Sequence, residues 1–296
     1  MFTTTTNTIP ATTANLGPGF DCLGLALSLT NQVTVKIADA GLSIEVHGEG
    51  AESIATDETN LVFKSAERLF ERVGRRPPGL QIIQNNQIPV SSGLGSSAAA
   101  VLAGLLAANT LLGFPLTDTK LLTLATDIEG HPDNVTPAFY GGLTLSLFDG
   151  EDLIVDHIPV PDMTVVVVLP VFDLLTIEAR AALPAQVPLS DAVFNASRVG
   201  LLVRALGAGD YDRLRIAMQD RLHQPYRMSL IPGMQTVFNE ALEAGAAGVV
   251  LSGAGPSVVA FASDNHEAIE KAMKEAFSAV GLESRSWILP IAPKKT

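Results

Sequence analysis

Two glycines and four serines fall in one short stretch, and this combination could bind a polyphosphate. The stretch is PVSSGLGSSAAA, residues 89–100, and an apolar run follows it. Glycine adopts positive φ without a steric clash, so a turn through Gly93 and Gly95 can direct successive backbone N–H groups to one point. The free N–H groups and dipole of a following helix would reinforce this anion site. The hydroxyls of Ser96 and Ser97 could cap that helix or bind a phosphate-associated Mg²⁺.

The same residues also occur in an ordinary glycine turn with a serine cap, and the stretch alone does not separate the two. It is not a Walker loop, because no Gly-Lys-Ser/Thr follows, and it lacks the G-x-G-x-x-G spacing of dinucleotide-binding folds. It shares with both a series of backbone amides that can surround a phosphate. Whether this stretch binds a phosphate or is an ordinary turn must therefore be judged from other segments of the chain.

Two further polar segments interrupt the apolar chain, at 11–21 and 129–134. Loops held by a rigid scaffold commonly carry function. The first offers Asn15 and Asp21. In the second, the Glu129 carboxylate beside a serine hydroxyl and phosphate oxygens would suit Mg²⁺, and a solvated charge at a helix end is the alternative.

His131 and two arginines are the remaining candidates for chemistry. An imidazole that titrates near neutrality could act as a general base, although a histidine in a Gly-His-Pro turn is commonly only a turn residue. Arg180 and Arg227 could converge on one small carboxylate, since guanidinium forks bind carboxylates in a bidentate manner. Two unrelated surface arginines are the alternative.

The composition sets limits on these functions. Hydrophobic residues make up 47% of the 296 residues and charged residues 17%, enough for a sizeable core. A net charge of −12 speaks against nucleic-acid and anionic-membrane partners. The single cysteine excludes an intrachain disulfide. The first residues do not resemble a signal peptide, and the apolar run at 98–112 is too short to span a bilayer, so we expect a cytoplasmic protein.

An extended segment before the glycine stretch, at 80–88, and a buried helix after it, at 96–112, must position it. Elsewhere the patterns predict helices at 60–73, 117–128, 190–206, 211–221, 234–243 and 267–280, and strands at 3–9, 23–28, 32–37, 42–47, 141–148, 153–157, 163–169, 248–252, 257–262 and 285–289. The β-branched run at 163–169 is typical of a strand buried on both faces. We predict an α+β fold in two domains, 1–160 and 161–296.

Four segments, taken in order, resemble the motifs of the GHMP kinase superfamily. They are PATTANLGPGFD (10–21), PVSSGLGSSAAA (89–100), EGHPDN (129–134) and SGAGPS (252–257), and the first and third are similar to those of the homoserine kinases. The resemblance covers essentially the whole chain. It implies an N-terminal domain like ribosomal protein S5 domain 2 and a C-terminal ferredoxin-like domain, with the active site in the cleft between them.

The resemblance further implies a kinase that uses ATP and Mg²⁺ to phosphorylate the side-chain hydroxyl of L-homoserine in threonine biosynthesis. It assigns the metal to Ser97 and Glu129. It assigns ATP to Pro89, Val90, Ser91, Ser92, Gly93, Leu94, Gly95, Ser96, Ser97, Ala98 and Ala99, with Asn60 near the adenine. The substrate would meet Asn15, Asp21, His131, Asn134, Thr176, Arg180 and Arg227, with catalytic roles for Asn134, His131 and Arg180.

These side chains suit a zwitterion with a terminal hydroxyl. Asp21 can bind the ammonium, the two arginines the carboxylate, and Asn15 and Asn134 the hydroxyl. Sister kinases have an aspartate base where Asn134 stands, and an asparagine cannot remove a proton. We therefore expect no strong protein base, with the proton passing to the γ-phosphate or to His131. The segment 253–256 is expected to pack against the glycine stretch.

Two other functions stay open at this point. One is another GHMP enzyme, either a kinase for a different small alcohol or a diphosphate decarboxylase; the arginine pair favours a substrate with an α-carboxylate instead. The other is a non-catalytic nucleotide-binding protein, which would not need both Ser97 and Glu129. We expect a homodimer without nucleic-acid or membrane partners.

Overall fold

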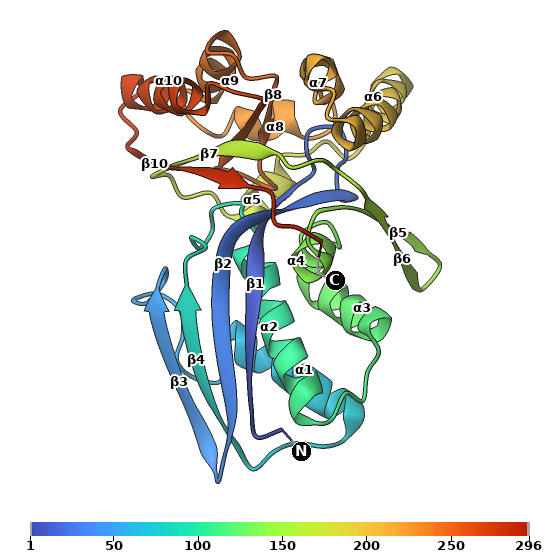
Figure 1. Cartoon of the computed structure of the whole chain (residues 1–296), viewed down its shortest axis with the longest axis vertical. Helices are drawn as coiled ribbons and strands as arrows, with labels where there is room; N and C mark the ends of the chain where they lie inside the picture. The colour runs from blue at the N-terminus through green and yellow to red at the C-terminus, as the bar shows by residue number, and fades with distance from the viewer. Residues whose placement is uncertain (1, 295–296) are drawn as a thin grey trace.

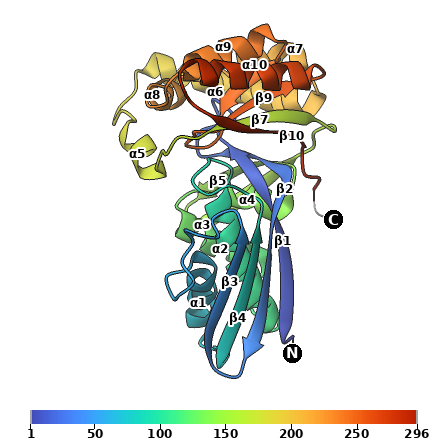
Figure 2. The ribbon, with the colours of Figure 1, turned by 90° about the vertical axis from the view of Figure 1, so that its left-hand side faces the viewer.

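The computed structural model describes residues 2–294 and shows two α+β units, one above the other (Figure 1, Figure 2). The first unit is built on a six-stranded sheet of order β3-β4-β2-β5-β6, with β1 also paired to β2. Its strands are β1 (Thr4–Ala14), β2 (Leu23–Ala38), β3 (Gly41–Gly48), β4 (Gly79–Asn86), β5 (Leu143–Asp149) and β6 (Asp152–Ile158). Helices α1 (Leu61–Val73), α2 (Ser96–Leu111), α3 (Asp118–Glu129) and α4 (Val135–Tyr140) lie along one side of this sheet (Figure 2).

The second unit is built on a four-stranded antiparallel sheet of order β10-β7-β9-β8. Its strands are β7 (Thr164–Pro170), β8 (Gly248–Leu251), β9 (Val258–Ala262) and β10 (Ser284–Pro290). Its helices are α5 (Thr176–Ala181), α6 (Leu189–Ala208), α7 (Tyr211–Ala217), α8 (Gln224–Met228), α9 (Met234–Glu243) and α10 (His266–Ala279). The predicted two-domain α+β fold is confirmed. Among the described residues, no helix is long and apolar enough to cross a membrane.

Strand β7 joins the hydrophobic cores of the two units. Its side chains alternate between the faces of the sheet, as the two-residue period of a strand requires. Val165 and Val167 pack into a hydrophobic core that extends through the first unit, whereas Val166 and Val168 pack into a separate core under the helices of the second unit. The prediction of a strand buried on both faces is confirmed.

Strands β1 and β2 are longer than the sequence pattern predicted. We expected Pro10 to end the first strand and a turn to divide the second, but β1 has 11 residues and β2 has 16. The pairing register shifts between Pro10 and Ala11, and a bulge tolerates a proline that has no N–H to donate. Asn31 looked like a turn residue, but it accepts hydrogen bonds from the amides of Gln87 and Ile88.

Helix α2 is the buried centre of the first unit. It is apolar on all sides, as expected for a helix enclosed by other elements. Gly104 lets α1 approach, because a Cβ there would lie 2.2 Å from the carbonyl oxygen of Val62. The prediction missed α4, α5 and α8, which span only five or six residues each, too few to show a periodic pattern. Helix α7 ends at Ala217, before the predicted end at 221.

Candidate active site

The glycine loop before α2 has the backbone of an anion-binding turn. Ser91, Gly93 and Gly95 all have positive φ, at 53°, 79° and 73°. Gly95 is the N-cap, and the amide of Ala99 is the first in the helix with a backbone acceptor. Within residues 2–294, the amides at 96–98 have no backbone acceptor. These three N–H groups, with the helix dipole behind them, form a ready site for phosphate.

The second unit holds this loop in place. Ser252 donates its hydroxyl hydrogen to the carbonyl of Gly93 at 2.7 Å, and the amide of Ser257 donates to the carbonyl of Ser92 at 3.2 Å. Ser92 in turn donates to the carbonyl of Pro89 at 2.7 Å. A Cβ on Gly93 would also lie 2.8 Å from the carbonyl oxygen of Gly255, so the expected contact between 253–256 and the glycine stretch is confirmed. These bonds use the carbonyls of the loop, and the amides at 96–98 are left for a ligand.

We expect Gly93→Ala to weaken the packing of the glycine loop against residues 252–257 and to raise the KM for ATP. A Cβ at Gly93 would lie 2.3 Å from the carbonyl oxygen of Ser252, at a φ of +79°. The strained backbone costs roughly 1–2 kcal/mol and the clash adds about 1–3 kcal/mol, measurable as a loss of unfolding free energy in urea. Gly113→Ala is the matched control, because it has the same φ of +79° and nothing within 4 Å of its Cβ. A KM for ATP that rises equally in both variants, or in neither, would contradict the expected role of the loop.

A cavity of about 460 Å³ lies between the glycine loop and the second unit. Most predicted site residues line it: Asn15, Asp21, Asn60, Val90, Ser91, Ser92, Gly93, Gly95, Ser96, Ser97, Ala99, Glu129, His131, Asn134, Thr176, Arg180 and Arg227. Pro89, Leu94 and Ala98 do not line it, because their side chains are buried in the core. Any contact of these three with a nucleotide is therefore limited to the backbone.

Ser97 and Glu129 meet at one end of the cavity. The Ser97 hydroxyl, in the first turn of α2, donates to Oε2 of Glu129, the last residue of α3, at 2.8 Å. Burial raises the pKa of Glu129, although the bond from Ser97 opposes this. A cation would favour the charged carboxylate. The two oxygens are ligands of the kind that Mg²⁺ prefers, and no group of three His, Cys, Asp or Glu within residues 2–294 could hold a metal ion by itself.

His131 is held by a buried carboxylate that the sequence analysis left without a role. The ring nitrogen Nδ1 lies 2.5 Å from Oδ1 of Asp133, which is 1% exposed. Burial acts to lower the pKa of His131, but the hydrogen bond and the charge of Asp133 outweigh it and raise the pKa. This pair favours the imidazolium, which adds a positive charge to the cavity and is a poor proton acceptor.

Asn134 is held by a second residue that the sequence analysis missed. Thr12, in β1, donates its hydroxyl hydrogen to Oδ1 of Asn134 at 2.7 Å. Both side chains are buried, and the amide nitrogen of Asn134 lies 3.5 Å from Asp133. With its oxygen occupied by Thr12, the asparagine offers chiefly an N–H donor to the cavity.

Asp21 and Arg180 bind each other in the structure. The guanidinium donates to both carboxylate oxygens, at 2.8 and 3.1 Å, and the two side chains are 36% and 39% exposed. We had expected each to bind one end of the substrate. An exposed ion pair contributes only about 0–1 kcal/mol, so an ammonium and a carboxylate of suitable spacing can replace it.

Arg227 lies beside them but is buried. Its Nε donates to the carbonyl of Ala179 at 3.4 Å, and its Nη1 donates to the carbonyl of Gly253 at 3.1 Å. The guanidinium carbons of Arg227 and Arg180 lie 5.1 and 5.8 Å from the centre of the Phe20 ring. The fold therefore brings the two predicted arginines together. Burial, and then the charge of Arg180, lower the pKa of Arg227.

Asn15 and Asn60 line the cavity with their amides already paired. Asn15 donates to the carbonyl of Gly253 at 2.9 Å and accepts from the amide of Asp21 at 3.0 Å. Asn60 caps α1 by accepting from the amides of Val62 and Phe63. Asn15 has a positive φ of 69° and joins two loops through these bonds, and its expected contact with a hydroxyl stays a prediction. Thr176 opens α5 at the exposed rim.

Both units of the chain match family models that describe one class of kinases. The model of the GHMP kinases N terminal domain matches residues 60–142, and the model of the GHMP kinases C terminal matches residues 202–279. A mevalonate kinase of L. major, solved with R-mevalonate, shares this fold with a TM-score of 0.78 at 21% identity, over 99% of this chain and 98% of that one.

Two homoserine kinases are much more similar. That of Carboxydothermus hydrogenoformans is 49% identical over 93% of this chain and 90% of its own length. The crystal structure of the homoserine kinase from Cytophaga hutchinsonii superposes with a TM-score of 0.89 at 35% identity, over 99% of this chain and 96% of that one. The chain belongs to the homoserine kinase family of the GHMP kinases.

Proposed function

We propose that the protein transfers the γ-phosphoryl group of ATP to the side-chain hydroxyl of L-homoserine, giving O-phospho-L-homoserine on the route to threonine. The observation that supports this most directly is the meeting of Asp21, Arg180 and Arg227 in the same cavity as the glycine loop. A substrate with an α-ammonium and an α-carboxylate complements these charges, whereas an isoprenoid or sugar alcohol does not.

The nucleotide and substrate are assigned to opposite ends of the cavity. The amides at 96–98 would bind the phosphates, and Ser97 and Glu129 would hold Mg²⁺. When bound, the ion would neutralise charge on the phosphate oxygens. At the other end, Asp21 and Arg180 exchange their mutual ion pair for the two charges of homoserine, and Arg227 provides a second donor to the carboxylate. Thr176 closes the rim.

Positioning and charge neutralisation then supply most of the catalysis. The hydroxyl oxygen of the substrate forms a bond to the γ-phosphorus while the bond to the β,γ-bridging oxygen breaks and ADP leaves. The hydroxyl proton passes to the transferred phosphoryl group, because Asn134 cannot accept it and the His131–Asp133 pair favours a protonated ring. Asn134 and the His131 imidazolium stabilise negative charge at the reacting centre.

A coupled assay of ADP release with homoserine, mevalonate, shikimate and galactose tests the proposal. We expect turnover with homoserine at a kcat/KM at least about 10²-fold above that for the other alcohols, since only homoserine carries both an ammonium for Asp21 and a carboxylate for the arginines. Turnover with mevalonate alone would reject the assignment in favour of another GHMP kinase. Nucleotide binding with no turnover on any alcohol would point to a non-catalytic member.

Asn134→Ala should lower kcat by about 10²-fold, because it removes a donor at the reacting centre. Thr12→Val should lower kcat by about ten-fold: it keeps the volume of the buried side chain but frees the asparagine to turn. The measurement is steady-state kinetics with both substrates saturating. An Asn134→Ala enzyme with an unchanged kcat would remove this residue from the mechanism.

We also propose that the protein works in the cytoplasm as a homodimer, without nucleic-acid or membrane partners. We likewise propose that the boundary between the two domains lies at residue 160. A net charge of −12 supports the absence of polyanionic partners, because self-repulsion between like charges opposes their binding. Sedimentation equilibrium gives the oligomeric state, and a monomer at micromolar concentration would reject the dimer.

A further inference from the structure

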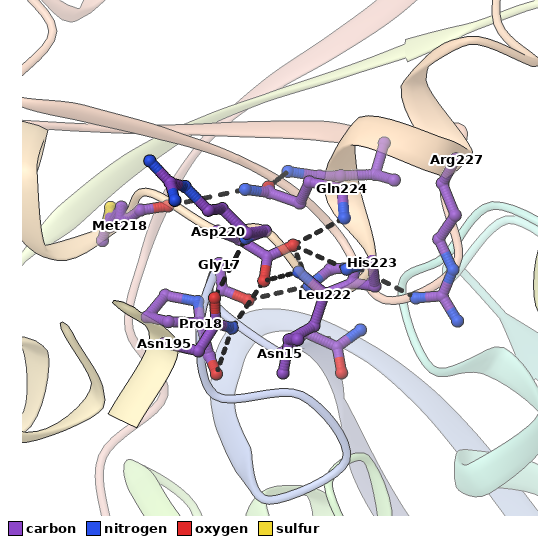
Figure 3. A network of polar contacts seen from close by, with 12 residues as sticks. Asn15, Gly17, Pro18, Asn195, Met218, Asp220, Leu222, His223, Gln224 and Arg227 are labelled. Carbon is purple, nitrogen blue, oxygen red and sulfur yellow. Dashed lines mark hydrogen bonds and ion pairs between the residues drawn. The ribbon is translucent and has the colours of Figure 1, made fainter. Parts of the chain in front are cut away.

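The buried arginine of the cavity is held by a side chain without a part in the chemistry above. His223, just before α8, is 0% exposed. Its Nε2 lies 2.7 Å from the carbonyl oxygen of Gly17, and its Nδ1 lies 3.2 Å from Nη1 of Arg227 (Figure 3). A carbonyl can only accept a hydrogen bond, and a guanidinium can only donate one. The ring is therefore neutral, with its hydrogen on Nε2 and a lone pair on Nδ1 directed at Arg227.

A buried carboxylate fixes the position of this ring. The side chain of Asp220 is fully buried and accepts from the backbone amides of Leu222, His223 and Gln224, at 2.9, 2.9 and 2.6 Å. The side chain of Asn195, from α6, donates to the same carboxylate at 2.6 Å (Figure 3). Four donors on one carboxylate make the turn before α8 rigid, so the imidazole cannot follow a moving arginine.

We propose that His223 is a positioning residue, whose neutral ring orients the guanidinium of Arg227 toward the substrate carboxylate. This inference rests on the proposed function. Protein acceptors engage Nε and Nη1 of Arg227, and no acceptor for Nη2 is found within residues 2–294. The guanidinium is thus held by the protein at Nε and Nη1, and Nη2 is left for the substrate carboxylate. Without the acceptor on His223, one buried N–H of Nη1 is unpaired and the fork turns to satisfy it.

The same ring is bonded to the loop that carries Asp21. Its Nε2–H donates to Gly17, four residues before that aspartate, across 206 residues of sequence. One imidazole therefore connects the arginine that binds the carboxylate with the loop that binds the ammonium. The two hydrogen bonds of the His223 ring can be removed one at a time by substitution. Asparagine places an amide oxygen near the position of Nδ1, whereas glutamine places an amide N–H near the position of Nε2.

The test compares His223→Gln with His223→Asn in the ADP-release assay. We expect His223→Gln, which loses the acceptor for Arg227, to raise the KM for homoserine by about ten-fold or more, as expected for an unpaired buried donor. We expect His223→Asn to raise it by no more than about three-fold. The KM for ATP should stay within about two-fold in both. Equal effects of the two variants on the KM for homoserine, or a parallel rise in the KM for ATP, would overturn the proposal.

A double-mutant cycle with Arg227→Lys separates positioning from a general structural role. If His223 acts through the guanidinium, His223→Gln should change the KM for homoserine by less than about two-fold in the Arg227→Lys background. The full effect in that background would overturn the proposal. If His223→Gln does not fold, the histidine ¹H–¹⁵N spectrum of the wild type decides, because a hydrogen on Nδ1 would contradict it. Wild-type protein without turnover on homoserine would reject the proposed function, whereas the spectrum would still report on His223.

Discussion

Arg227→Met should raise the KM for homoserine by about 10²–10³-fold and leave the KM for ATP within about three-fold. The substitution removes a buried charged donor that complements the carboxylate, and hydrogen bonds to charged groups contribute about 1.5–3 kcal/mol each. Methionine fills a similar volume and cannot donate. Steady-state kinetics with each substrate varied in turn gives both constants.

Arg285→Met is the control for a general loss of positive charge. Arg285 binds Glu49 on the surface and does not line the cavity, so its removal should leave both constants unchanged. The melting temperature of each variant should be recorded, because Arg227 also bonds to Gly253 and Ala179. A homoserine KM that does not respond to Arg227→Met would show that the carboxylate binds elsewhere.

Glu129→Gln should lower kcat by about 10²–10³-fold at a fixed Mg²⁺ concentration, because the amide cannot supply the negative charge that a metal ligand needs. Ser97→Ala should lower kcat by about ten-fold, since water can replace a neutral hydroxyl ligand. Part of the loss in Glu129→Gln should be recovered at high Mg²⁺, and an excess of EDTA should abolish turnover of the wild type. The measurement is kcat as a function of free Mg²⁺.

Asp127→Asn on the exposed face of the same helix removes the same charge without contact with the cavity. It should have the wild-type dependence on Mg²⁺. If Glu129→Gln also had the wild-type dependence, the assignment of the metal to Ser97 and Glu129 would be wrong.

Much of the fold follows from local pattern. The apolar run after the glycines predicted α2, and the four valines of β7 predicted a strand buried on both faces. Proline and asparagine misled the prediction in β1 and β2, because a bulge accommodates Pro10, and Asn31 accepts hydrogen bonds from the amides of Gln87 and Ile88, just after β4. Short helices such as α8 lie below the length at which a period can be recognised.

The contacts within the site could not be predicted from local pattern, because the residues that bind each other are distant in sequence. Thr12 and Asn134 are 122 residues apart, Asp21 and Arg180 159, and Gly17 and His223 206. The residue types pointed to phosphate, carboxylate and metal chemistry, but no local pattern indicates which side chains bind each other before a ligand arrives. No local pattern therefore indicated a role for His223.

The two faces of β7 also restrict how the enzyme can move. Opening the cleft by swinging one domain away from the other would expose Val165, Val167 and Phe261, which are 0% exposed. Each such side chain costs about 1.5–3 kcal/mol to bring into water, so this junction is not a hinge. We therefore expect substrates to enter and products to leave at the exposed rim of the cavity, where Thr176 lies at the start of α5, without separation of the two units.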